Sequence, residues 1–136
     1  MPPLDHPTTT LLLILVPLLL TELGQRLYLH LVNPDADVYI AGYNVHHLYT
    51  GALIEIPAAF VLAFGGMAPA VRAGALVALG VGSAMVLDQV VYLITTDGSN
   101  RAYLTPVSLW GAIVLEGLAV GLLLVLWALA GCAGCP

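Results

Sequence analysis

The sequence predicts an all-α integral membrane protein, a bundle of four antiparallel transmembrane helices. Hydrophobic residues fill 60% of the 136 positions and charged residues only 8%, whereas roughly a quarter of the residues in soluble domains are charged. Four apolar stretches are each long enough to cross the ~30 Å hydrocarbon core of a bilayer as a helix. Backbone amides cannot stay unpaired in lipid, and the short alternating strands of a membrane barrel are not seen. We expect residues 1–136 to form one transmembrane domain.

The first expected helix, residues 10–31, is interpreted as a retained span and not as a cleaved signal peptide. It has no basic segment before its apolar run, and Glu22, Gln25 and Arg26 stand where a small-residue cleavage site would be needed. The helix is expected to end at a turn-rich connection, residues 33–37, which two aspartates make acidic.

The other three expected helices cover residues 44–64, 71–95 and 106–130. A Gly-Gly pair follows the first of them, an Asp-Gly pair follows the second, and a proline, which favours the first helical position, begins the third. Short connections imply that neighbouring helices run antiparallel. Small residues recur at four-residue spacing on the last two helices, which predicts close helix packing: they are Gly74, Ala78, Gly82, Gly117 and Gly121.

The charge distribution excludes a nucleic-acid-binding surface. Lysine and arginine together number three, and the formal net charge is -5, so too few cations are present to follow a phosphate backbone. The positive-inside rule also has little to count, because Arg72 and Arg101 fall on opposite sides of the membrane. The acidic first connection is expected to face outward, which places both termini in the cytoplasm.

Each expected helix carries one carboxylate near its middle; these are Glu22, Glu55, Asp88 and Glu116. An ionisable group inside a spanning helix costs about 2.5 to 3.5 kcal/mol, so each one needs a physical reason. At a rise of 1.5 Å per residue, the three glutamates lie about 14 to 16 Å from the helix ends at the first and third connections, and the aspartate about 10 Å. Because the helices alternate in direction, sequence spacing does not force this agreement. We expect one polar layer near the midplane.

Other polar side chains lie on the same faces as this layer. On the first helix Glu22, Arg26 and His30 recur at four-residue spacing and form a polar stripe. On the third helix Tyr92 shares a face with Asp88, and its phenol is expected to hold that carboxylate in place. We expect these residues to form a buried polar network or an ion relay.

Two adjacent histidines open the second helix. His47, Gly51 and Glu55 lie on one face, and the glycine leaves room beside the imidazole. Imidazoles and carboxylates suit iron, manganese and zinc, and helix bundles with inward His and Glu hold two-metal sites. We therefore predict a membrane-embedded metal site with a redox or hydrolytic role, whose ligands are His46, His47, Glu55, Asp88 and Glu116.

Two short segments carry a resemblance to known proteins. Residues 44–51, NVHHLYTG, and residues 86–90, VLDQV, resemble a group of small, poorly characterised prokaryotic integral membrane proteins. Those proteins carry a His-x-His-His element on one helix and an acidic residue late in the next helix; here Asn44 stands at the position of the first histidine. The resemblance implies a prokaryotic plasma membrane and a shared site made of His46, His47 and Asp88.

Three other functions follow from the same residues. The first is translocation of protons or cations through the carboxylates, which in so small a bundle needs a homo-oligomer. The second is a haem held by His30 together with His46 or His47, which leaves the carboxylates without a role. The third is a non-catalytic subunit or assembly factor of a larger membrane complex, in which buried polar groups specify packing. Cys132 and Cys135 form an isolated pair that favours a reduced tail over a zinc site.

Elemental analysis of detergent-purified protein tests the metal-site hypothesis. If the hypothesis holds, the natural chain contains near-stoichiometric iron, manganese or zinc, and His47→Ala and Asp88→Ala both lose it because each removes a ligand. Well-folded protein without metal would contradict the hypothesis and leave the carboxylates to transport or to packing.

Overall fold

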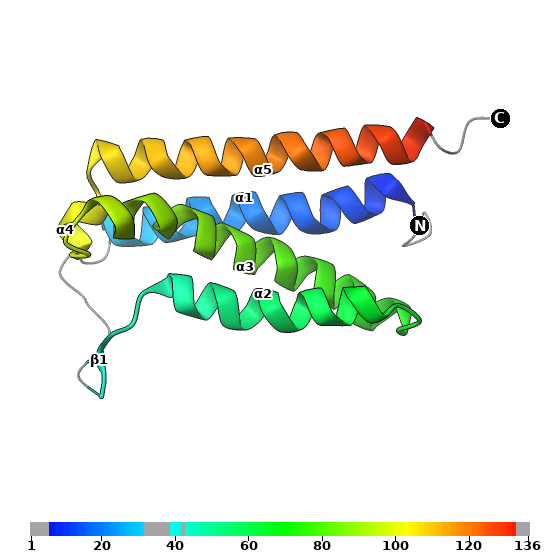
Figure 1. The fold of residues 1–136 in the computed structure, drawn as a ribbon, viewed down its shortest axis with the longest axis horizontal. Coiled ribbons are helices and arrows are strands. Elements are labelled where there is room, and N and C mark those ends of the chain that lie inside the picture. The colour runs from blue at the N-terminus through cyan, green and yellow to red at the C-terminus, as the bar shows by residue number, and fades with distance from the viewer. Residues whose placement is uncertain (1–5, 32–38, 42, 133–136) are drawn as a thin grey trace.

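Four long helices dominate the computed structural model, which describes residues 6–31, 39–41 and 43–132. They are α1 (Pro7–Leu31), α2 (His47–Phe64), α3 (Pro69–Thr95) and α5 (Pro106–Cys132), and each is long and apolar enough to span a membrane. Successive long helices alternate in direction (Figure 1). The predicted all-α fold with four membrane-spanning helices is confirmed.

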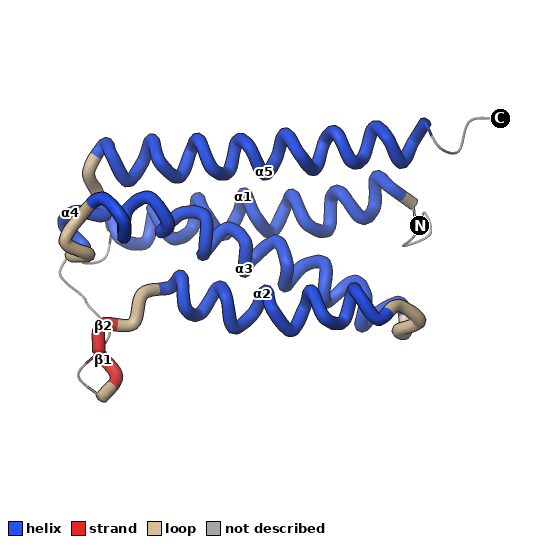
Figure 2. The backbone as a smooth tube through the Cα atoms, in the orientation of Figure 1, coloured by secondary structure: helices blue, strands red, loops and turns tan. Residues whose placement is uncertain are grey.

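A two-stranded sheet and a short helix lie in the connections between the long helices (Figure 2). Strand β1 (Tyr39–Ile40) pairs antiparallel with β2 (Tyr43–Asn44), and the four-residue helix α4 (Asn100–Tyr103) precedes α5. The hairpin and an extended His46 delay the start of α2 to His47, later than the expected residue 44. The acidic connection, residues 33–37, and Cys135 lie outside the described residues, and Cys132 is exposed.

Helix α3 is the centre of the arrangement. It packs against α1, α2 and α5, and α1 also contacts α5. Helix α2 packs mainly against α3, so it lies on the flank of the group formed by α1, α3 and α5. The most apolar stretch of α3 is accordingly 28% buried, against 11% in each of the other three helices. Residues on different faces of α3 therefore contact each of the other long helices.

Glycines allow α3 to approach its neighbours closely. A Cβ atom added at Gly80 would lie 2.3 Å from the backbone oxygen of Ile14 on α1. On the α2 side, a Cβ added at Gly51 would lie 2.8 Å from the backbone oxygen of Gly82, and on the α5 side a Cβ added at Gly111 would lie 2.4 Å from an α3 side chain. Each of the three helices thus meets α3 at a point where a side chain is missing.

The predicted stripes of small residues are correct only in part. Gly82 lies at the crossing with α2, but a Cβ added at Gly74, Gly117 or Gly121 would find no atom within 4 Å. These three glycines are exposed on the outer faces of α3 and α5. Four-residue spacing places small residues on one face of a helix, but it does not say whether that face meets a neighbour.

Alanine at Gly80 tests the contact between α1 and α3. Gly80→Ala is expected to lower the free energy of unfolding by about 1 to 3 kcal/mol, because the added methyl group overlaps the α1 backbone. Gly74→Ala is the matched control on the same helix, and it is expected to be neutral or stabilising by up to about 1 kcal/mol. Circular dichroism during unfolding in mixed micelles measures the free energy of unfolding of both variants. Equal stability of the two variants would contradict the close contact.

Candidate functional site

A buried carboxylate on α3 is the centre of a polar network at the α4 end of the bundle. Asp88 is 0% exposed. The guanidinium of Arg26 on α1 donates to its Oδ1, the hydroxyl of Tyr103 on α4 donates to its Oδ2, and Nε2 of His47 on α2 lies 3.0 Å from Oδ2. Both oxygens of this carboxylate are therefore engaged by side chains from three other elements.

The Arg26 side chain bridges two carboxylates. Its Nε donates to Glu22, one turn earlier on α1, and its Nη2 donates to Asp88. The guanidinium carbon also lies 4.9 Å from the centre of the Tyr103 ring, in the range of a cation–π contact. One cation thus compensates two acidic groups that would be costly if they stood alone in hydrocarbon.

Gln89 determines how His47 is oriented. Its side-chain Oε1 accepts a hydrogen bond of 2.8 Å from the backbone N–H of Leu48, in the first turn of α2. Its Nε2 therefore faces Nδ1 of His47, at 3.0 Å. Because an amide nitrogen only donates, Nδ1 accepts, and the ring proton lies on Nε2, from which it is donated to Asp88.

A second acidic group, Glu116 on α5, extends the network toward the bilayer interior. It is 8% exposed, and its carboxyl group interacts with that of Glu22. Glu22 Oε2 and Glu116 Oε1 are both buried and lack a hydrogen-bond donor among the described residues. We call Glu22, Arg26, His47, Asp88, Gln89, Tyr103 and Glu116 together the Asp88 network.

Further buried polar atoms lie on α1 and α5, the helices that carry Glu22 and Glu116. Both side-chain amide atoms of Gln25 and the Ser108 hydroxyl find no hydrogen-bond partner within the described part of the chain. Ser108 is 0% exposed and lies two turns from Glu116 on the same face, with the small Ala112 between them. Buried polar atoms of this kind are usually satisfied by water. The polar region therefore continues from Glu116 toward the α4 end.

Tyr103, and not the predicted Tyr92, holds the Asp88 carboxylate. The Tyr92 hydroxyl donates instead to the backbone oxygen of Ser99 at 3.0 Å, and its ring packs edge-to-face against those of Tyr103 and His46. Helix α4 folds back over the site and brings Tyr103, which is 1% exposed, onto the network. Burial raises the pKa of the Tyr103 phenol well above its ordinary value, so the phenol stays protonated and remains a donor.

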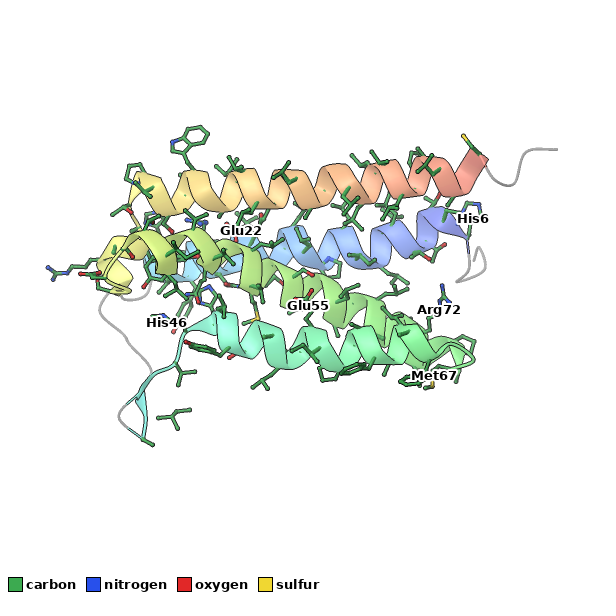
Figure 3. All side chains as sticks on the ribbon, viewed as in Figure 1. His6, Glu22, His46, Glu55, Met67 and Arg72 are labelled. Atoms are coloured by element: carbon green, nitrogen blue, oxygen red, sulfur yellow. The ribbon has the colours of Figure 1, made fainter. Side chains whose placement is uncertain are left out.

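The other predicted site residues lie outside the Asp88 network. Glu55 accepts a hydrogen bond of 3.1 Å from Ser83 on α3. Figure 3 shows Glu55 near the middle of α2, away from the end at His46. His46 directly precedes α2, where its side chain makes no capping hydrogen bond and its ring contacts that of Tyr92, and His30 is exposed in the last turn of α1. The structure thus brings together Glu22, Arg26, His47, Asp88 and Glu116 from the predicted residues, and it adds Gln89 and Tyr103.

The predicted metal ligands do not converge on one point. Within the described ranges, no group of three or more histidines, cysteines, aspartates or glutamates is arranged to hold a metal ion. Asp88 is occupied by an arginine, a histidine and a tyrosine, while Glu55 pairs with a serine. Metal binding therefore stays a prediction, for which elemental analysis is the test.

Comparisons with known proteins do not assign the chain to a family. No protein-family model, no curated protein and no solved structure matches the chain. The resemblance to small prokaryotic membrane proteins accordingly stays a prediction.

Removal of the cation tests whether the network stabilises the bundle. Arg26→Leu is expected to lower the free energy of unfolding by about 3 kcal/mol, because it leaves the buried Asp88 and the partly buried Glu22 without their cation. The double variant Arg26→Leu, Asp88→Leu is expected to recover part of that loss, since an apolar pair leaves fewer uncompensated charges. Unfolding in mixed micelles measures both variants.

Arg101→Leu serves as the control, because this arginine is exposed on α4 and an exposed pair contributes little, so its loss is expected to change stability by less than about 1 kcal/mol. A loss in Arg26→Leu no larger than in the control would show that the buried charges do not stabilise the fold.

Proposed function

We propose that the protein translocates protons, and that the Asp88 network is the relay that carries them into the membrane. The observation that supports this proposal most directly is the chain of hydrogen-bonded or interacting titratable groups from His47 through Asp88 to Glu22 and Glu116. Ionisable residues that face the interior of a transmembrane bundle are a recurring feature of proton pathways.

The relay runs from a partly exposed group to a buried one. His47 is the first residue of α2 and its side chain is 23% exposed, whereas Asp88 is 0% and Glu116 8% exposed. An imidazole takes a proton on one nitrogen and releases another proton from the second. A proton that arrives at Nδ1 of His47, after the Gln89 amide turns away, would release the Nε2 proton to Asp88.

The charge of the network supports a proton held between the two glutamates. Glu22, Asp88 and Glu116 contribute three negative charges if all are ionised, and Arg26 contributes one positive charge, so the sum is -2. Like charges that close together in a low-dielectric region disfavour this state. One shared proton reduces the sum to -1 and gives the buried oxygens of Glu22 and Glu116 a hydrogen bond.

Arginine does not release its proton, so Arg26 positions the carboxylates and does not itself relay. Transfer from Asp88 to Glu22 would therefore have to pass through water beside Arg26. Beyond Glu116, the rest of α5 has no ionisable residue up to Cys132. We therefore propose that a homo-oligomer or a larger membrane complex completes the path. The proposed location is a prokaryotic plasma membrane, with both chain termini in the cytoplasm.

Proton flux into proteoliposomes tests the relay. With a trapped pH-sensitive dye and a potassium diffusion potential, Asp88→Asn and Glu116→Gln are each expected to slow the flux by at least about tenfold, because each removes a proton-accepting group. Asp97→Asn is the matched control: Asp97 is an exposed carboxylate between α3 and α4, and its loss is expected to leave the rate unchanged.

If both network variants kept the proton flux of the unchanged protein, the relay would be contradicted. Near-stoichiometric iron, manganese or zinc that is lost in His47→Ala and Asp88→Ala would then favour a metal site. Protein that shows neither bound metal nor proton flux would favour a non-catalytic subunit whose polar groups specify packing.

A further inference from the structure

A separate groove opens on the surface of the bundle, with Glu55 in its wall and the exposed Leu122 at its edge. It has a volume of about 350 Å³ and is formed by residues of α1, α2, α3 and α5. Apart from Glu55 and Ser83, all its lining residues are leucine, isoleucine, valine or alanine. Helix α3 runs obliquely to α5 in this part of the molecule (Figure 1). The groove is therefore an apolar site that contains one acidic group.

The acidic group is held in place by the crossing of α2 and α3. A Cβ added at Gly82 would lie 2.7 Å from Cβ of Glu55, so the two helices are in close contact at this level. Ser83, the next residue on α3, donates a hydrogen bond of 3.1 Å to Glu55 Oε1. The carboxylate is thus directed along α3 into the groove, and it is only partly buried.

Glu55 has no cationic partner in the structure as described. None of the ion pairs formed by the described residues includes it. It is the ninth of the 18 residues of α2, about 12 Å along the helix from either end at 1.5 Å per residue. The amines and phosphates of lipid headgroups lie too far away to reach it. A carboxylate at this depth calls for a cation or a strong hydrogen-bond donor.

The groove favours an organic cation over a metal ion. One carboxylate and one hydroxyl supply too few oxygens for calcium, which takes six to eight oxygen ligands, and the apolar walls do not suit the waters that magnesium keeps. An anionic ligand would be repelled. An ammonium group matches the carboxylate in charge and donates hydrogen bonds, while an attached alkyl chain matches the apolar walls.

We propose that the groove binds lipophilic amines, which enter from the bilayer and place a protonated nitrogen against Glu55 and an apolar chain along α1, α3 and α5. This site is distinct from the Asp88 network, because Glu55 pairs with Ser83 and not with the residues of that network. The proposal therefore does not depend on the proton relay.

Equilibrium binding of radiolabelled dodecylamine to protein in phosphatidylcholine nanodiscs tests this site, with empty nanodiscs as the background. The Kd is expected to rise about tenfold or more in Glu55→Gln, which keeps the shape of the side chain but removes its charge. Asp97→Asn, which removes an exposed carboxylate outside the groove, is expected to keep the natural Kd. Dodecanol, the neutral analogue, is expected to bind the natural protein much more weakly than the amine.

A second variant keeps the carboxylate but fills the groove. Leu122→Trp places a larger side chain in the groove wall and is expected to abolish dodecylamine binding while Glu55 is unchanged. This variant tests the binding site if Glu55→Gln does not fold. Natural dodecylamine binding in the folded variants would overturn the proposal. Equal binding of dodecanol and dodecylamine to the natural protein would also overturn it, since the site would then recognise the chain and not the charge.

Discussion

The ion pairs of Arg26 with Glu22 and Asp88 are the constraint on which the rest of the site depends. No water in the hydrocarbon core compensates an isolated charge, so α1 and α3 must lie at a height and rotation that bring the guanidinium to both carboxylates. Once Asp88 is placed, His47 and Tyr103 contact its second oxygen. A single carboxylate thereby joins α1, α2, α3 and α4.

Packing of apolar surface does not by itself select these helix positions, because lipid chains are as apolar as leucine side chains. The structure uses two other means. Glycines bring the backbones of α1, α2 and α5 close to α3, and the Asp88 network adds directional hydrogen bonds toward the α4 end. Close backbone contact determines how far apart the helices lie, and the network determines their rotation. Together they explain why α3 is the most buried helix.

The two acidic sites differ in their surroundings, and this difference separates their chemistry. Asp88 is fully buried, and an arginine compensates its charge. Glu55 faces an apolar groove with a serine as its neighbour, which suits a ligand that brings its own positive charge. We propose different roles for these two carboxylates on adjacent helices because their neighbours differ.

The sequence by itself determined the membrane fold, because the length and apolarity of four segments leave a bilayer few alternatives. It also identified Glu22, Arg26, His47, Asp88 and Glu116, since ionisable residues stand out in apolar spans. It did not separate Glu55 from them, nor identify Tyr103 as the partner of Asp88. Distance along a helix gives the height of a residue but not the neighbour that it faces. Only the tertiary structure decided those partners, because they depend on helix rotation, on the flank position of α2 and on the fold of a four-residue helix in a connection.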